Sequence, residues 1–148
     1  MTRFRDARRE DVAAVVALLS DDALGTQREG LDLEAYLGAF ELMQQEAGNR
    51  LIVGEVEGRI VATYQLTFIA GLSLRATRRA QVESVRVAAD MRGQGIGAAL
   101  IADAEARARA AGCRLLQLTS NASRLRARKF YEELGFTPSH IGYKRDLN

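Results

Sequence analysis

A short glycine-rich run, Arg92-Gly93-Gln94-Gly95-Ile96-Gly97, has the residue types of a site that binds a phosphate group. It follows a strand-like segment that ends in Val85-Arg86-Val87, and it leads directly into a helical pattern. A helix start has backbone N–H groups without intrahelical partners, and the helix dipole favours negative charge there. Three glycines in five residues let the backbone approach an anion closely, and Arg92 can add a charged hydrogen bond. The run therefore predicts a local anion site.

Two better-known phosphate loops differ from this run in spacing and in context. A Walker loop needs Lys and then Ser or Thr after its last glycine, whereas Ile96, Gly97 and Ala98 follow Gly95 here. A Rossmann loop needs glycines spaced G-x-G-x-x-G after the first strand of its fold. Here the spacing is G-x-G-x-G, and the run lies past the middle of the chain. Both of these nucleotide sites are excluded.

The segments that must position the run have the patterns of an α/β (α+β) domain. Apolar residues at helical spacing, with capping residues, predict four helices, at 10–20, 32–48, 95–111 and 123–134. Strand-forming residues predict a short N-terminal strand and further strands at 51–56, 59–68, 80–88, 114–119 and, interrupted by Pro138, 136–147. The expected fold is one domain over residues 1–148, with a right-handed βαβ unit at its centre.

Composition limits the classes of function. The 148 residues suffice for one domain, and 47% hydrophobic against 27% charged residues excludes a disordered chain. A net charge of +2 is too small for binding nucleic acid through bulk electrostatics. Cys113 is the only cysteine and His140 the only histidine, so no cluster of these residues exists to bind a metal. No apolar run reaches the roughly 18 residues of a membrane span, and a cytoplasmic protein is expected.

Two separate motifs of this sequence resemble those of the GNAT acetyltransferases. The run Arg92–Gly97 matches the pyrophosphate loop of that family, written Q/R-x-x-G-x-G/A, at each defined position. The later residues Asn121, Arg124 and Ala127, followed by the run Phe130–Phe136, are similar to its C-terminal signature. The resemblance covers almost the whole chain. It implies an N-acetyltransferase that uses acetyl-CoA as cosubstrate without a metal, and a mixed, mostly antiparallel sheet of about six or seven strands flanked by four helices.

The resemblance also implies where acetyl-CoA binds. Strands 80–88 and 114–119 are expected to splay apart around the pantetheine arm, and the backbone N–H groups of residues 93–98 are expected to hold the pyrophosphate. Asn121 either contacts coenzyme A or caps the next helix, and the basic residues that follow either meet the 3′-phosphate or form a solvated face. The expected cofactor contacts are Val85, Arg86, Val87, Arg92, Gly93, Gln94, Gly95, Ile96, Gly97, Ala98, Asn121 and Lys129.

The implied chemistry is direct attack of a primary amine on the thioester within a ternary complex. An alkylamine with a pKa of about 10.4 is mostly protonated at neutral pH, so the site needs a base. Glu83 shares the strand parity of Val85 and Val87 and is the candidate base, directly or through a water; the alternative is a solvated or ion-paired residue. Tyr131 is the candidate acid for the departing thiolate, with a merely buried, packed tyrosine as the alternative. The Val85 N–H is expected to face the acyl oxygen.

The sequence leaves the acceptor amine open. The segments expected to select it are 21–31, the second helix, 71–79 and the C-terminal strands. Three arginines within 71–79 fit either an acidic acceptor or a solvated surface. His140 either borders the acceptor pocket or is structural, and Cys113 is expected to be a small core residue. The alternatives to the enzyme are a non-catalytic module that senses acyl-CoA and a protein that binds nucleic acid through its arginines. A homodimer is implied by the resemblance alone.

Overall fold

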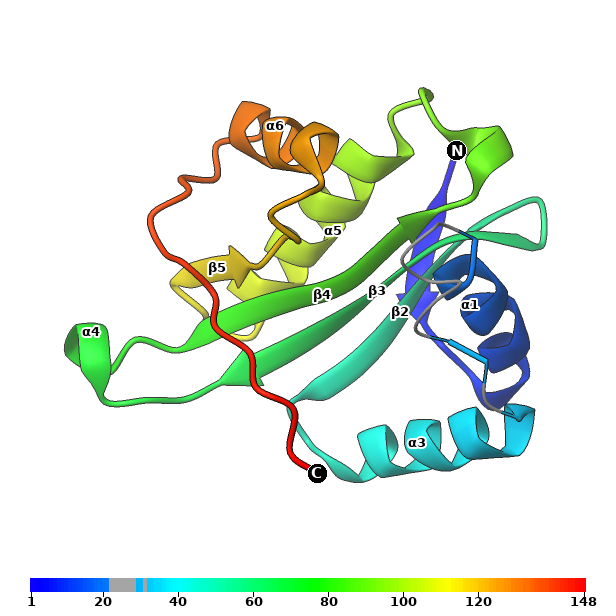
Figure 1. Ribbon diagram of the computed structural model, residues 1–148, viewed down its shortest axis with the longest axis horizontal. Coiled ribbons are helices and arrows are strands. Elements are labelled where there is room, and N and C mark those ends of the chain that lie inside the picture. The colour runs from blue at the N-terminus through cyan, green and yellow to red at the C-terminus, as the bar shows by residue number, and fades with distance from the viewer. Residues whose placement is uncertain (22–28, 31) are drawn as a thin grey trace.

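A single mixed sheet forms the centre of the molecule (Figure 1). The computed structural model describes residues 1–21, 29, 30 and 32–148, so most of the loop predicted at 21–31 lies outside the described residues. In the described part, the sheet has five strands in the order β1-β2-β3-β4-β5. Neighbouring strands run antiparallel from β1 to β4, and β5 pairs with β4 in parallel. Their bounds are β1 Arg3–Asp6, β2 Asn49–Val56, β3 Arg59–Ile69, β4 Arg79–Val87 and β5 Leu115–Leu118.

Helices cover both faces of this sheet. Helices α1 (Val12–Leu19) and α3 (Leu33–Gln45) lie on one face, and α5 (Ile96–Ala110) lies on the other with α6 (Leu125–Glu133) beside it (Figure 1). Short helical turns, η1 (Arg9–Asp11), α4 (Ser73–Ala76) and η2 (Ala89–Met91), occur in the connections. Because α5 joins β4 to the parallel strand β5, the predicted βαβ unit is confirmed.

Alternation along the strands decides which helices each side chain meets. In β3, Tyr64 is fully buried and packs with Leu100 and other residues of α5, whereas the neighbouring Thr63 faces α1 and α3. In β2, Ile52 joins the α5 side, and Val53 packs against α1 and α3. Successive side chains of a strand point to opposite faces, so each strand contributes to both cores. Each fully buried aliphatic or aromatic side chain stabilises the fold by roughly 1.5–3 kcal/mol.

Strand β4 contains a bulge that shapes the site described below. Its pairing with β3 shifts by one residue between Thr63 and Gln65. Two residues of β4, Ser84 and Val85, therefore lie opposite the single residue Tyr64. Ser84 has φ +55°, in the left-handed region that residues other than glycine rarely adopt. An extra residue in one strand reverses the faces to which the following side chains point.

The strand predicted at 136–147 is absent, so that prediction was wrong. After α6 the chain forms no strand, and residues 137–148 are all exposed. The residues that predicted the strand include Ile141 and Tyr143, which are 79% and 89% exposed. An alternating pattern forms a strand only where another strand accepts its backbone hydrogen bonds, and Pro138 removes one donor. The described residues therefore form five strands and not six or seven.

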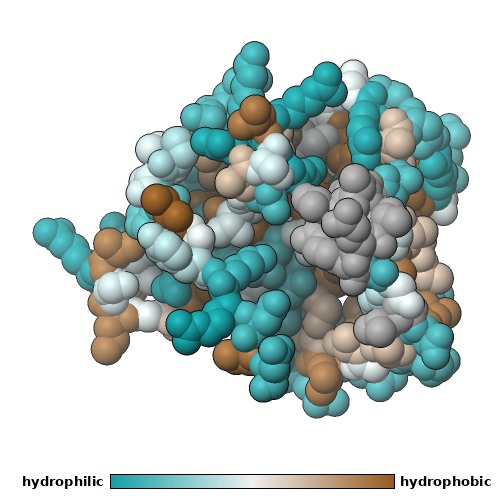
Figure 2. All heavy atoms as spheres, viewed as in Figure 1, coloured by the Kyte–Doolittle hydropathy of each residue, from teal (hydrophilic) through white to brown (hydrophobic). Residues whose placement is uncertain are grey.

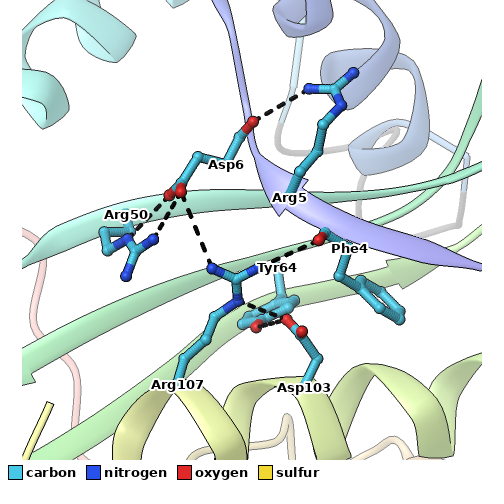
Figure 3. A network of polar contacts seen from close by, with 7 residues as sticks. All are labelled: Phe4, Arg5, Asp6, Arg50, Tyr64, Asp103 and Arg107. Carbon is cyan, nitrogen blue, oxygen red and sulfur yellow. Dashed lines mark hydrogen bonds and ion pairs between the residues drawn. The ribbon is translucent and has the colours of Figure 1, made fainter. Parts of the chain in front are cut away.

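A polar network joins β1 and β3 to α5 (Figure 3). The Tyr64 hydroxyl donates to Asp103 Oδ2 at 2.6 Å, and Arg107 Nε donates to the same oxygen at 2.8 Å. Arg107 also donates to the Phe4 carbonyl at 3.3 Å and lies 4.0 Å from Asp6 Oδ2. Burial, followed by the hydrogen bond to Asp103, raises the pKa of Tyr64 well above its ordinary value. Tyr64 thus stays protonated, and its hydrogen bond to Asp103 connects β3, at the position opposite the bulge, to α5.

We expect Tyr64→Phe to lower the free energy of unfolding by about 1–3 kcal/mol, the usual cost when a buried polar group loses its partner. The phenyl ring still fills the core, so packing changes little. Urea unfolding measures the loss, and a double-mutant cycle with Asp103→Ala isolates the pair. Strictly additive effects of the two substitutions would show that the hydrogen bond does not stabilise the fold.

Candidate active site

The glycine-rich run forms an open turn at the start of α5. Gly93 has φ +77° and Gly95 has φ +81°, both in the left-handed region that favours glycine. A Cβ atom at either position would have no neighbouring atom within 4 Å. The backbone conformation therefore requires glycine at both positions, and the space outside the turn is open to a ligand.

The backbone N–H groups of residues 93–98 have no acceptor in the described part of the chain. The first hydrogen bond of α5 runs from the Ala99 N–H to the Gly95 carbonyl at 3.1 Å. No side chain of the described residues caps the start of the helix. Consecutive donors at the positive end of a helix dipole form a site for an anion such as a phosphate group. This is the arrangement that the sequence predicted.

Two contacts hold the turn in place. Arg92 Nε donates to the Val87 carbonyl at 3.2 Å, which connects the turn to the end of β4. An ideal Cβ on Gly97 would lie 3.1 Å from Cζ of Phe130, so α6 packs closely against the first turn of α5. A larger side chain at position 97 would displace Phe130 and the adjacent Tyr131. Gly97 thus serves the packing of α6 as well as the approach of an anion.

The pairing of β4 with β5 ends before β4 itself ends. Their parallel pairing runs from Arg79 opposite Leu115 to Val82 opposite Leu118. Strand β4 then continues through Val87, while β5 ends at Leu118. All four residues of β5 are paired, so the pairing ends where β5 ends, and the expected splaying of the two strands stays a prediction. A chain-like ligand can therefore lie along the free edge of β4.

The residues predicted to contact pantetheine lie on this free part of β4. Val85 and Val87 are partly buried against the core on the α5 side. Arg86 pairs with Thr63 on the opposite face, where its side chain is buried and its Nη1 donates to the Val85 carbonyl at 2.9 Å. A carbonyl oxygen has two lone pairs, so this carbonyl can still accept a hydrogen bond from a ligand. The backbone contacts themselves remain predictions.

Tyr131 lies among aromatic rings at the edge of the core. Its ring centroid is 5.2 Å from that of Phe130 and 5.9 Å from that of Phe136, both in edge-on geometry. Burial raises the pKa of Tyr131 above its ordinary value, and the positive charges of Arg124 and Arg86 oppose this shift. Within the described residues, its hydroxyl has no hydrogen-bond partner. The phenol therefore keeps its proton at neutral pH, and its hydroxyl is available to a ligand.

The bulge places Glu83 on a different face from the one predicted. Sequence parity grouped Glu83 with Val85 and Val87, but the extra residue at Ser84 reverses the alternation between them. Glu83 pairs with Gln65 and shares its face, toward α1 and α3, whereas the two valines pack toward α5. The expected shared parity was wrong. Glu83 can serve only an amine that approaches from the face covered by α1 and α3.

Two glutamines orient the Glu83 carboxylate. Gln81 Nε2 donates to Glu83 Oε1 at 2.6 Å, and Gln117 Nε2 donates to Gln81 Oε1 at 2.8 Å. This series of hydrogen bonds runs from β5 to β4 on one face of the sheet. The second carboxylate oxygen of Glu83 has no partner among the residues with described positions. A partly buried carboxylate with one oriented and one open oxygen is suited to accept a proton.

Asn121 and Lys129 occupy positions with structural roles. Asn121 Oδ1 accepts hydrogen bonds from the backbone N–H and the hydroxyl of Ser123, at 3.0 and 2.6 Å, and so shapes the turn before α6. Lys129 is exposed and lies 3.9 Å from Glu133 on the same helix. The Asn121 amide nitrogen and the Lys129 ammonium remain free to turn toward a ligand. Their contacts with coenzyme A stay predictions.

Cys113 is buried in the core near the end of α5, as predicted. His140 is exposed, and its Nδ1 lies 2.6 Å from the hydroxyl of Ser139. Among the residues with described positions, no group of three or more His, Cys, Asp or Glu is arranged to hold a metal ion. None of the helices in those residues is both long enough and apolar enough to cross a membrane.

The arginines of segment 71–79 lie at the far end of β4 from the glycine-rich turn. The guanidinium of Arg78 lies over the ring of Phe68, 5.6 Å from its centroid. Along an extended strand, the distance from Arg79 to Val85 is about 20 Å. Figure 2 shows hydrophobic side chains gathered at the same end of the molecule, where α4 lies in Figure 1. These arginines therefore lie at the opposite end of β4 from the bulge, and the binding of an acidic acceptor by them stays a prediction.

Two features of the site have no signal in the sequence. A bulge of this kind is usually marked by glycine at the left-handed position, and Ser84 carries no such mark. Arg86 was expected to contact the cofactor, and the structure shows that its side chain is 8% exposed and donates to the carbonyl of Val85. Both features lie where β4 turns from its pairing with β5 to its free edge.

Comparison with known proteins matches this chain to acetyltransferases. The model of the acetyltransferase (GNAT) family matches residues 12–136. The aminoalkylphosphonate N-acetyltransferase of Salmonella typhimurium (strain LT2) is 32% identical over 148 residues, which cover 97% of this chain and 90% of the relative.

Solved structures share the whole architecture. A crystal structure described as a transcriptional regulator from Bacillus halodurans C-125 has a TM-score of 0.94 and 38% identity, and the match covers 99% of this chain and 100% of that one. An acetyltransferase of Trypanosoma brucei has a TM-score of 0.79 and 27% identity, with 99% and 100% coverage.

Proposed function

This chain belongs to the GNAT acetyltransferase family, and from that premise we propose that it transfers the acetyl group of acetyl-CoA to a primary amine by direct attack within a ternary complex. The observation that carries the proposal is the set of free backbone N–H groups at residues 93–98, at the start of α5. The diphosphate of acetyl-CoA is the group that such donors bind. From there, the free edge of β4 offers the pantetheine arm a path toward the bulge.

Residues on the two faces of β4 then have different roles, with the base on one face and the acid on the other. The ammonium of the acceptor gives a proton to Glu83, directly or through a water, and the neutral nitrogen forms a bond to the acetyl carbon. The N–H of Val85 donates to the acyl oxygen as negative charge develops there. When the carbon–sulfur bond breaks, Tyr131 gives a proton to the departing sulfur. Glu83 passes the ammonium proton to solvent and then takes the second proton from the nitrogen of the tetrahedral intermediate as that intermediate collapses. The products are the amide, the free thiol and one proton released to solvent, and solvent then returns the second proton from Glu83 to Tyr131.

The raised pKa of Tyr131 makes it a weak acid toward the departing thiolate. Transfer from a phenol with a pKa above 10 to the thiolate of a thiol with a pKa of about 8.5 is uphill by at least about 2 kcal/mol. The hydroxyl therefore stabilises the developing thiolate first as a hydrogen-bond donor. Proton transfer is completed as the thiol leaves the site.

Release of free thiol from acetyl-CoA in the presence of amines tests this function. The panel should include 2-aminoethylphosphonate, because a relative is named for aminoalkylphosphonates, together with alkylamines, amino acids and peptide N-termini. Initial rates measured at varied concentrations of both substrates should give intersecting reciprocal plots, as a ternary complex requires. Parallel plots would indicate an acetylated enzyme and contradict direct attack.

Two alternatives make different predictions in the same assay. A sensor of acyl-CoA binds the thioester but releases no thiol with any amine. The relative described as a transcriptional regulator raises the second alternative, a DNA-binding role. That role requires affinity for duplex DNA that falls steeply with salt, without acetyl-CoA affinity.

We expect Glu83→Gln to lower kcat/KM for the amine by about 100-fold at pH 7, because the base that accepts the ammonium proton is lost. The deficit should shrink as the pH approaches the amine pKa of about 10.4, where the free amine becomes abundant. A pH profile of both proteins from 7 to about 10 measures this convergence. Glu34→Gln, which makes the same change at an exposed glutamate of α3, is the control and should behave as the wild type. A deficit that stays constant with pH would remove Glu83 from the base role.

A further inference from the structure

A small cavity lies between the sheet and the two helices α1 and α3. Its volume is about 120 Å³. Val15 and Leu19 of α1 form one wall, and Phe40 and Met43 of α3 form another. The lining is almost entirely apolar, and none of the described residues that line it is lysine, arginine or histidine.

Of the polar side chains that line this cavity, those of Tyr36, Thr63 and Gln65 are already hydrogen bonded within the protein. Thr63 donates its hydroxyl to the Ile52 carbonyl at 2.9 Å, and Gln65 Nε2 donates to Asn49 Oδ1 at 2.8 Å. The Tyr36 hydroxyl donates to a glutamate oxygen at 2.9 Å. A polar or charged ligand group would therefore find few partners in the cavity and would lose its hydration. An apolar group would lose no hydrogen bonds on entering the cavity and would displace poorly bound water.

One end of the cavity reaches the bulge of β4. Ser84, the residue at the left-handed position of the bulge, belongs to the lining. Glu83 precedes it in the chain and pairs with Gln65, another lining residue. The carboxylate therefore stands on the same face as the cavity and beside its polar end. An ammonium group at that end would be matched in charge by Glu83.

We propose that this cavity receives a compact apolar side group of the acceptor, so that the preferred acceptors are primary amines with a branched alkyl chain or a small ring. The inference rests on the acetyl transfer proposed above and specifies its substrate class. With the apolar group in the cavity, the amino nitrogen lies at the end formed by Ser84 and Glu83. A cavity of about 150 Å³ holds benzene, so a slightly smaller one fits a group of about four or five carbons.

A series of alkylamines tests the size and polarity of the acceptor. From methylamine to 3-methylbutan-1-amine, kcat/KM should rise by about fourfold for each added carbon, the factor for burying one methylene. The rise should stop once the cavity is full, and 2-aminoethylphosphonate should be a poorer acceptor than 3-methylbutan-1-amine. A flat series, or a preference for the phosphonate, would overturn this inference while leaving the acetyl transfer itself in place. The absence of thiol release with every amine of the panel would instead contradict the proposed function.

A matched pair of substitutions on α3 connects the effect to the cavity. Ala39 lines the cavity, whereas Ala35 lies one turn earlier on the same helix and does not line it, and both are exposed. Ala39→Leu fills the cavity and should lower the ratio of kcat/KM for 3-methylbutan-1-amine to that for methylamine by at least about tenfold. Ala35→Leu should leave this ratio unchanged. Equal ratios in both variants would show that the cavity does not hold the acceptor.

A binding measurement without turnover separates the cavity from catalysis. The alcohol 3-methylbutan-1-ol has the same apolar group but no amine. It should raise the melting temperature of the wild-type protein and of Ala35→Leu, because it binds only the folded state. The shift should be lost in Ala39→Leu. An equal shift in all three proteins would place the alcohol elsewhere and contradict the inference.

Discussion

Gly95→Val should lower the affinity for acetyl-CoA by more than about 100-fold, the loss expected when two hydrogen bonds to a charged group are removed. Gly95 has φ +81° and begins α5, and valine, which is branched at Cβ, does not tolerate that conformation. The turn must change its shape, and the N–H groups of residues 93–98 then no longer point toward one anion. Isothermal titration with acetyl-CoA measures the loss.

Gly112→Val is the matched control for this substitution. Gly112 lies just past the other end of α5, has φ +80°, and would also place a Cβ in open space. The backbone strain of about 1–3 kcal/mol is therefore similar in the two variants, and their melting temperatures should fall by similar amounts. Only the variant at position 95 should lose acetyl-CoA. Equal losses of affinity would show that general destabilisation, and not the turn, is responsible.

Tyr131→Phe should lower kcat by about 100-fold or more, the contribution of a positioned general acid, with little change in the dissociation constant of acetyl-CoA. The ring contacts with Phe130 and Phe136 remain in the variant, so the core is preserved. Pre-steady-state and steady-state rates of thiol release, together with calorimetry, separate turnover from binding. Tyr143→Phe, at an 89% exposed position, is the control and should behave as the wild type. Unchanged turnover in Tyr131→Phe would assign Tyr131 to packing only.

The pH dependence of the wild type follows from the direction of the Tyr131 shift. The acid form of the phenol is needed, it is present below the pKa, and it is lost as the pH rises through the pKa. Because burial raises the pKa of Tyr131 above its ordinary value near 10, kcat should show no decline from loss of this proton below pH 10. A decline centred near pH 8 in wild type and absent in Tyr131→Phe would contradict this assignment.

The glycine-rich turn could be predicted because its requirements are local. The left-handed conformation at Gly93 and Gly95 leaves few other residue types, and a helix start always presents unpaired N–H groups. The four long helices and the βαβ unit were predicted for the same reason, since their apolar spacing depends on each segment alone. Their order then located the site at the start of α5.

The face of Glu83 and the C-terminal segment could not be predicted because they depend on neighbouring strands. The bulge at Ser84 is defined by the pairing of β4 with β3, and serine at a position does not indicate a left-handed backbone conformation there. Strand-forming residues such as Ile141 and Tyr143 favour a strand, but residue types do not tell whether a partner edge is present. Local patterns therefore predicted the elements, while the faces and partners of those elements required the structure.

The measurement that tests the central claim most directly is the titration of ¹⁵N-labelled protein with acetyl-CoA, followed by the amide resonances of residues 93–98. These N–H groups are free in the structure and should donate hydrogen bonds to the diphosphate. We expect the largest shifts at saturation in Gly93, Gly95 and the amides that begin α5, and desulfo-coenzyme A should produce the same pattern because it carries the same diphosphate. If acetyl-CoA saturates the protein while these resonances stay where they were, the diphosphate is held elsewhere and the turn at the start of α5 is not its binding site.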